Sequence, residues 1–198
     1  MIYAVIDTNV IVSSMLTRNP ASPTRQILDR VRDGIIIPMI NDDILEEYTD
    51  VLSRVKFSFA QTDVDQMLNM FNSRGQKYVP ECLRRVFIDL NDVIFYETYL
   101  MRDDAYLVTG NLKHFPQEPR IISSFDMINI LNIVSKTSDN LLNDTESPYL
   151  SSSIQIAWEA VERMRASAVA NGIADMSMEE IDEEIRQYRE ERRALFQE

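Results

Sequence analysis

The stretch that most constrains the fold is residues 2–12, Ile-Tyr-Ala-Val-Ile-Asp-Thr-Asn-Val-Ile-Val. Five mostly apolar, β-prone residues stop abruptly at Asp7-Thr8-Asn9, which is typical of a buried parallel strand. Because ligands of open α/β sheets bind at the carboxyl ends of the strands, Asp7 is a candidate for chemistry. The alternative is that Asp7 only caps the helix that follows.

Strands and helices alternate through the first half of the chain. A helix with proline near its start and glycine after its end is expected at residues 23–33, and a buried strand at residues 35–39. Asn41 caps another helix, and a further helix runs from Thr62 to about Gly75. This order predicts an α/β fold in which helices cover a parallel sheet on both sides.

The second half of the chain repeats this plan, with short apolar strands and capped helices. The expected elements are, in order, a strand at residues 77–79, a helix opened by Asn91 and Asp92, a strand at residues 105–109, an edge strand at residues 120–122 and a helix at about residues 125–134.

Three acidic residues are expected to meet at one edge of this sheet. Asp7 ends the first strand, Glu47 lies on the helix after the second strand, and Asp92 starts a later helix. Three crowded carboxylates need a cation to stay ionised together. Oxygen ligands of this kind suit Mg²⁺ or Mn²⁺, so the cluster predicts a metal site. Taken singly, each acid can equally be a solvated or helix-capping residue.

Net charge and rare residues exclude several other classes of protein. The formal charge of -12 argues against a broad phosphate-binding surface, so a nucleic acid would need a local basic rim or metal ions. Cys82 and His114 are the only cysteine and histidine, which excludes a disulfide framework and a multi-histidine zinc site within one chain. Because no apolar run can span a membrane and no secretory signal is present, a cytoplasmic protein without membrane contact is expected.

Four segments, in this order, resemble the signatures of PIN-domain ribonucleases. They are Asp7-Thr8-Asn9-Val10, residues 44–52 (ILEEYTDVL), residues 89–95 (DLNDVIF) and residues 107–115 (LVTGNLKHF). The resemblance covers about residues 1–135. It implies a three-layer α/β/α fold with a central parallel sheet and a metal-dependent endoribonuclease, commonly the toxin of a toxin–antitoxin pair.

Position by position, the resemblance implies that Asp7, Glu47 and Asp92 are the catalytic acids that bind Mg²⁺ or Mn²⁺. Glu47 is preferred to its neighbour Glu46 because apolar residues follow it as they follow the acid in the family. The fourth acidic position of many family members falls on Asn111. An amide binds a metal or a water through its oxygen but brings no charge, so weaker activity or dependence on one tightly held metal is expected.

The resemblance implies hydrolysis of RNA phosphodiester bonds without a catalytic histidine or serine, because a bound metal ion activates the water. His114 is therefore expected to be a surface or loop-packing residue, with a phosphate contact as the alternative. Substrate contacts are expected from Thr8, Asn9, Thr109 and Lys113. A local basic rim is expected from Arg18, Arg25, Lys56 and Lys113, with scattered solvated charge as the alternative.

The composition changes near residue 136, which predicts three parts. They are a nuclease domain at residues 1–136, a polar linker at residues 137–150 and a helical segment at residues 151–198.

Two helices are expected in this last segment, one capped by Ser153 and one started by a capping box from Ser177 to Glu180. A helix pair this short cannot bury its own core and must dock on another surface. The apolar face of the last helix is expected to comprise Ile181, Ile185, Tyr188 and Leu195, with Arg192 interrupting it.

Residues 157–191 are similar to the toxin-binding tails of antitoxins found beside PIN toxins. The resemblance implies that the tail places an arginine among the metal-binding acids, with Arg192 as the first choice and Arg189 as the second. A guanidinium among unpaired carboxylates forms charge-assisted hydrogen bonds. The tail can serve its own chain or a second chain of a homodimer, and both arrangements stay open.

Two other function classes also stay open. An aspartyl-phosphate phosphatase would place Asp7 at the end of the first strand, but its signature has a second acid where Asn9 stands. A non-catalytic PIN-like module that only binds RNA or protein is the other class, and Asn111 and the acidic composition favour it.

Overall fold

The predicted α/β fold is confirmed by a computed structural model, which describes residues 1–80, 92–138 and 152–195, without the side chains of residues 135–138. The elements are β1 (Ile2–Ile6), α1 (Thr8–Leu16), α2 (Pro23–Arg32), β2 (Ile36–Ile40), α3 (Asp42–Leu52), α4 (Gln61–Arg74), β3 (Gln76–Lys77), α5 (Val93–Tyr99), β4 (Tyr106–Val108), the 3-10 turn η1 (Leu112–His114), β5 (Ile121–Ile122), α6 (Ser124–Ser138), α7 (Ser152–Ala170) and α8 (Met178–Leu195).

Five parallel strands form the centre of the molecule in the order β3-β2-β1-β4-β5. The apolar strand β1 lies in the middle, with Ile2 opposite Ile36 of β2 and Ile6 opposite Val108 of β4. The chain builds outward from β1 to β3 and then returns to build the other side. The carboxyl ends of β1 and β4 are therefore the topological switch point, where open α/β sheets bind ligands.

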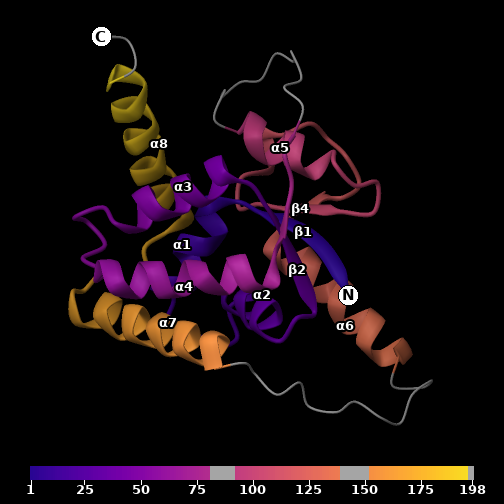
Figure 1. Cartoon of the computed structure of the whole chain (residues 1–198), viewed down its shortest axis with the longest axis horizontal. Coiled ribbons are helices and arrows are strands. Elements are labelled where there is room, and N and C mark those ends of the chain that lie inside the picture. Colours follow the sequence, from indigo (N-terminus) through magenta and orange to yellow (C-terminus); the bar gives the residue numbers. More distant parts are fainter. Residues whose placement is uncertain (81–91, 139–151, 196–198) are drawn as a thin grey trace.

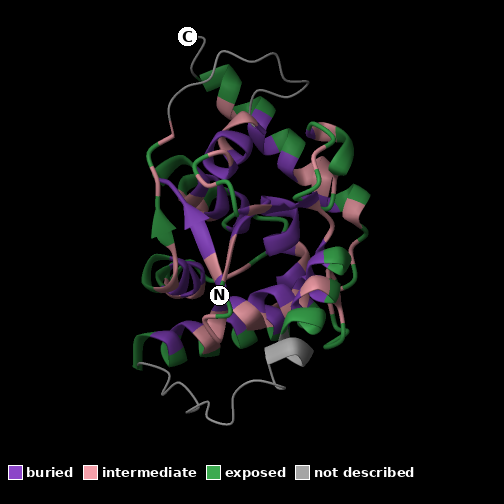
Figure 2. Ribbon diagram, turned by 90° about the vertical axis from the view of Figure 1, so that its right-hand side faces the viewer, coloured by how far each residue is buried: buried purple, intermediate pink, exposed green. Residues whose placement is uncertain are grey.

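Helices cover both faces of this sheet in the predicted three-layer arrangement (Figure 1). Helix α5 packs on β1, β2 and β4, whereas α2 packs on β2, α1 and α6. Buried residues line β1, β2 and β4 and the inward sides of the helices, whereas the edge strand β3 and the outer helix surfaces are exposed (Figure 2). The core thus holds the ends of β1 and β4 in place.

Most predicted elements lie within one or two residues of their expected positions. The helix that follows Asp7, considered only as an alternative, is α1. Helix α6 reaches two residues into the predicted linker, and Ser153 lies inside α7, which begins one residue earlier. Cys82, Asn91 and residues 139–150 of the predicted linker lie outside the described residues.

The two C-terminal helices dock on the domain by different surfaces. Helix α7 lies along α4 and buries Val161 and Met164, whereas α8 contacts α1 and α3 and buries Ile181 and Ile185 (Figure 1). The predicted apolar face of α8 is wrong at its end, because Leu195 is 76% exposed where the helix extends past the domain.

The predicted capping box at the start of α8 is confirmed. The Ser177 N–H donates to Glu180 Oε2 at 2.8 Å, and the Glu180 N–H donates to Ser177 Oγ at 3.2 Å. The start of the helix is therefore determined locally. Among the described helices, none is long and apolar enough to cross a membrane.

Phe71 of α4 provides a test of the packing that supports the site. Its buried ring meets Tyr48 edge-on with the centroids 5.6 Å apart. Phe71→Ala is expected to lower the free energy of unfolding by about 3–5 kcal/mol, because it removes buried surface and leaves a cavity. Urea denaturation measures this loss. The exposed neighbour Asn72→Ala is the control, and equal losses in the two variants would contradict the packing.

Candidate active site

Asp7 directly follows β1 and occupies the N-cap position of α1, yet its side chain makes no capping hydrogen bond. Instead, Thr109 Oγ1 donates to Asp7 Oδ2 at 2.6 Å, and Asn9 Nδ2 donates to the same oxygen at 3.1 Å. Thr109 follows β4, so the two central strands deliver interacting side chains to the switch point. This arrangement speaks against capping as the role of the Asp7 side chain.

Glu47 reaches the same region from α3. The Asn41 side chain caps this helix by accepting from the Ile44 N–H at 2.7 Å. Farther along the same helix, Glu47 Oε1 accepts a hydrogen bond from Thr8 Oγ1 at 2.5 Å. The Tyr48 hydroxyl donates to the carbonyl of Ile6, so α3 is tied to the end of β1.

Asp92 enters the site at the N-cap position of α5. Its Oδ2 lies 3.1 Å from His114 Nδ1, and His114 Nε2 lies 2.8 Å from Asn111 Nδ2. His114 is 40% exposed and packs against its own turn, as expected, but it also contacts an acid of the site, which was not expected. Because a 3-10 turn has three residues per turn, η1 brings His114 and Asn111 to the same side. Their spacing of three residues is the only sign of this contact in the sequence.

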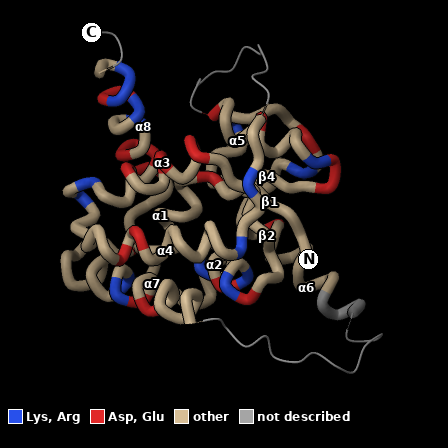
Figure 3. The backbone as a smooth tube through the Cα atoms, in the orientation of Figure 1, with Lys and Arg blue, Asp and Glu red and all other residues tan. Residues whose placement is uncertain are grey.

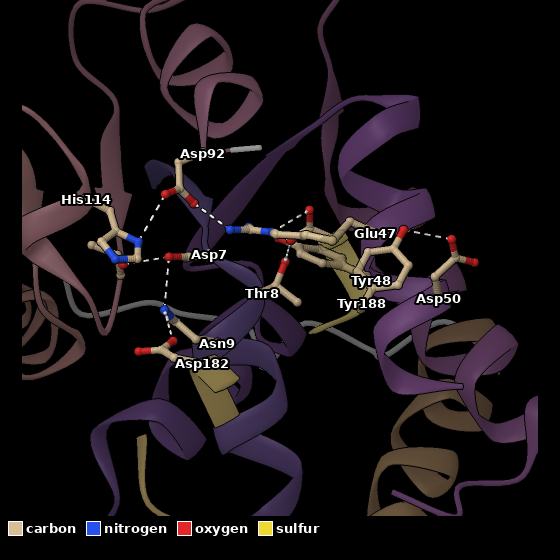
Figure 4. Close-up of polar contacts among 12 residues, drawn as sticks. Asp7, Thr8, Asn9, Glu47, Tyr48, Asp50, Asp92, His114, Asp182 and Tyr188 are labelled. Atoms are coloured by element: carbon tan, nitrogen blue, oxygen red, sulfur yellow. Dashed lines mark hydrogen bonds and ion pairs between the residues drawn. The ribbon is translucent and has the colours of Figure 1, made fainter. Parts of the chain in front are cut away.

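Arg189 of α8 lies between two of the acids. Its Nη1 donates to Asp92 Oδ1 at 2.8 Å, its Nη2 to Glu47 Oε1 at 2.8 Å and its Nε to Glu47 Oε2 at 3.3 Å. Figure 4 shows Asp92 and Glu47 on opposite sides of the site with Asp7 below them. The exposed fractions are 1% for Asp92, 5% for Glu47, 4% for Asp7 and 6% for Arg189, so this ion cluster is almost completely buried.

The expected order of the two arginines is reversed. Arg192 Nη2 donates to Glu46 Oε2 at 2.7 Å and its Nη1 donates to the Tyr188 hydroxyl at 3.0 Å, outside the acid cluster. Arg192 has the right direction around the helix axis, but it lies about one turn farther toward the C-terminus. Helical periodicity predicts direction, and the position of α8 along the domain decides which arginine reaches the acids.

The crowding of acids in the site changes the pKa values of Asp7 and Arg189. Burial and the charges of Asp92 and Glu47 raise the pKa of Asp7 to about 7, although Arg189 and the Thr109 hydroxyl lower it. Burial lowers the pKa of Arg189, but the charges of Glu47 and Asp92 more than offset this and raise it above its usual value. The charge of Arg189 therefore does not offset the effects of burial and of the neighbouring carboxylates at Asp7.

A cavity of about 300 Å³ remains between the acids and α8. It is bordered by Asp7, Asp92 and His114 on the domain side and by Asp182 on α8. Asn9 Nδ2 donates to Asp182 Oδ1 at 3.1 Å, so the tail contacts the site at a second point (Figure 4). Asp182 has no distinguishing mark in the sequence, because it is one of several acids near the start of α8.

The oxygen donors suit Mg²⁺ or Mn²⁺ by their chemistry. Across residues 1–80, 92–138 and 152–195, however, no three acidic, histidine or cysteine side chains are arranged to hold a metal ion together. Glu47 and Asp92 bind Arg189 instead. The expected convergence of three acids on one metal is thus absent with α8 docked, because a cation of the chain lies between two of them.

The remaining expected contact residues divide into two groups. Thr8 and Thr109 are fully buried with their hydroxyl groups on Glu47 and Asp7, so they orient carboxylates, whereas Lys113 is exposed on η1. Three residues of the expected basic rim are paired with acids of the C-terminal segment, although Arg18 and Lys56 remain more than half exposed. The pairs are Arg18–Asp175, Arg25–Glu162 and Lys56–Glu184.

The raised pKa of Asp7 predicts how stability depends on pH. The folded chain keeps a proton on Asp7 up to about pH 7, whereas the unfolded chain loses it near pH 3.8. Protonated Asp7 therefore contributes its full share to the free energy of unfolding below the unfolded pKa, and this contribution is lost as the pH rises through the folded pKa. Asn cannot lose a proton, so the free energy of unfolding of Asp7→Asn relative to that of the unsubstituted chain should rise by about 2–4 kcal/mol from about pH 4 to pH 8. Urea denaturation across this range is the measurement, and a gain equal to that of the exposed control Asp43→Asn would contradict it.

Comparison with known proteins gives one result that agrees with this geometry. No curated protein and no solved structure matches the chain. A family profile described as PIN domain matches residues 3–113, which is more than half of the chain and includes the ends of β1 and β4, α3 and the start of α5. The chain therefore belongs to the PIN domain family, whose members are generally metal-dependent nucleases.

Proposed function

We propose that this chain is a metal-dependent endoribonuclease of the toxin type, held inactive by its own α8. The observation that carries the proposal is the guanidinium of Arg189 between Glu47 and Asp92. These two acids and Asp7 are the residues proposed to bind Mg²⁺ or Mn²⁺. In this proposal, a cation of the tail takes the place of the catalytic metal ion.

When bound, the divalent ion would supply an activated water and positive charge beside the scissile phosphate. The residues of the chain have the task of holding the acids in one orientation. Thr109 and Asn9 hold Asp7, and Thr8 holds Glu47. Asn111 contributes an amide and no charge, so three carboxylates carry the negative charge of the proposed centre.

Arg189 and a metal ion would compete for the same carboxylates. Three hydrogen bonds join the guanidinium to Glu47 and Asp92, and a metal ligated by these acids must displace them. Binding linkage makes this competition reciprocal, so the factor by which docked α8 weakens metal binding equals the factor by which bound metal weakens the docking of α8. The tail therefore inhibits without destroying the site.

The tail described here lies on its own domain, and this supports inhibition within one chain. Exchange of the tail between two chains of a homodimer is an alternative form of the same contact. A non-catalytic PIN module is the second candidate function, favoured by Asn111 and by the missing metal geometry among the described residues. The phosphatase alternative has less support, because Asn9 donates to Asp7 instead of supplying a second acid.

Arg189→Ala in the full-length chain is expected to expose both metal binding and RNA cleavage. With Mg²⁺ or Mn²⁺ at about 100 times its dissociation constant, the variant should be stabilised by about 2.7 kcal/mol, and the unsubstituted chain by much less. Thermal unfolding with and without metal measures this difference, and gel analysis of a labelled RNA measures cleavage. Adding Asp7→Asn, Glu47→Gln or Asp92→Asn should abolish cleavage.

Arg192→Ala is the matched control, because it removes the same charge from the same helix without touching Asp7, Glu47 or Asp92. It should unmask less metal binding and less cleavage than Arg189→Ala. Metal stabilisation without any cleavage of diverse RNAs would favour the non-catalytic module. Cleavage that persists in EDTA would rule out the metal mechanism.

The toxin role predicts a growth phenotype. Induced expression of Arg189→Ala in a bacterial host should arrest growth, whereas the unsubstituted chain and Arg189→Ala combined with Asp92→Asn should be tolerated. Optical density after induction, with equal protein levels checked by immunoblot, is the measurement. If the Arg189→Ala variant cleaves RNA but the host grows normally, the toxin role is rejected and the nuclease activity stands.

A further inference from the structure

Arg54 lies in the loop after α3, two residues beyond Leu52, where that helix ends. Its side chain is only 17% exposed. Arg54 contacts Glu184 and Glu191 of α8, and Glu47 contacts Arg189, which lies between these two glutamates in the sequence of α8. The same helix therefore covers both the acid cluster and this cation.

Two carboxylates of α8 bind this arginine. Arg54 Nη1 and Nη2 donate to the two oxygens of Glu191 at 2.9 and 3.3 Å, and Arg54 Nε lies 3.4 Å from Glu184 Oε2. Glu184 also lies 3.8 Å from Lys56 Nζ. The paired contact with Glu191 is the fork geometry by which arginine recognises carboxylates and phosphates alike.

Both acidic partners belong to the helix whose removal opens the proposed active site. Among the described residues, the nuclease domain forms no ion pair with Arg54 through a carboxylate of its own. Release of α8 therefore leaves Arg54 without these two carboxylates, on the side of the domain that α8 had covered. A phosphate group is the anion that a nuclease substrate brings to such a position.

Glu191 is not explained by the preferences of α8 alone. The helix contains seven acidic and four basic residues, and acids are favourable near its N-terminus because of the helix dipole. Glu191 lies in the last turns, where the dipole disfavours a carboxylate. Its pairing with Arg54 supplies a reason for an acid there. Figure 3 shows acidic and basic segments of α8 beside the acidic segments of α3.

We infer that Arg54, with Lys56 beside it, binds a backbone phosphate of the RNA flanking the scissile bond, and that Glu184 and Glu191 occupy this place while α8 is docked. This inference rests on the proposed nuclease function. It gives α8 two complementary contacts. Arg189 takes the position of a cation among the acids, and the two glutamates take the position of the substrate anion.

The first test uses the full-length chain with Ile181→Asp and Ile185→Asp, which place charges at two buried apolar positions of α8 and should release this helix. Binding of a fluorescent oligouridine is measured by anisotropy in EDTA over a series of salt concentrations. Adding Arg54→Gln should weaken binding about tenfold and lower the slope of log K against log salt by about 0.7, the value for one phosphate on a single strand.

Arg163→Gln is the matched control, since this α7 arginine is 50% exposed and pairs with Asp63 and Gln66 away from the site. It removes the same charge and should change affinity less than twofold. Equal losses of affinity in Arg54→Gln and Arg163→Gln would overturn the inference, because net charge alone would then explain binding.

A second test leaves the apolar docking surface of α8 intact and decides the matter if the first variants do not fold. Glu184→Gln with Glu191→Gln should raise oligouridine affinity severalfold, and adding Arg54→Gln should cancel the gain. A gain that survives Arg54→Gln would overturn the inference. Binding in EDTA requires neither metal nor cleavage, so loss of the Arg54 effect with cleavage intact rejects this inference alone, and the reverse result rejects the proposed function alone.

Discussion

The buried ion cluster of Arg189, Glu47 and Asp92 is the interaction on which the arrangement of the C-terminal helix depends. Carboxylates at the edge of a sheet lose hydration when they are covered, and their repulsion shows in the raised pKa of Asp7. A cation is required to offset this cost, and removing one partner of such a buried cluster is strongly destabilising. The electrostatic demand that suits the site to a metal ion therefore also suits it to a guanidinium.

The two C-terminal helices meet this demand in different ways. Helix α7 packs its apolar side along α4, as a core helix does, whereas α8 combines a short apolar stripe with polar contacts at Glu47, Asp50 and Arg54. The charged residues of α8 meet residues of opposite sign, with Arg189 on Glu47 and with Glu184 and Glu191 on Arg54. Docking of α8 is thus sensitive to anything that competes for those charges.

Much of the site could be predicted from local sequence because its parts are attached to the ends of regular elements. The stop of an apolar strand made Asp7 a candidate, and the helices after it made Glu47 and Asp92 candidates. The resemblance to PIN-domain ribonucleases favoured Glu47 over Glu46. His114, Asp182 and Arg54 could not be identified in this way. His114 is brought in by a 3-10 turn, and the other two matter only because α8 lies across α3, which no local pattern encodes.

The sequence by itself determined the alternation of strands and helices and the capping box at Ser177, because each depends on residues close together in the chain. It also determined the family, through short segments that occur in a fixed order. Only the tertiary structure decided which arginine reaches the acids. Periodicity sets the direction of a side chain around a helix axis, and both Arg189 and Arg192 are compatible with the docking side. How far α8 extends along α3 depends on contacts distant in sequence. That position puts Arg189 between Glu47 and Asp92 and leaves Arg192 beside Glu46.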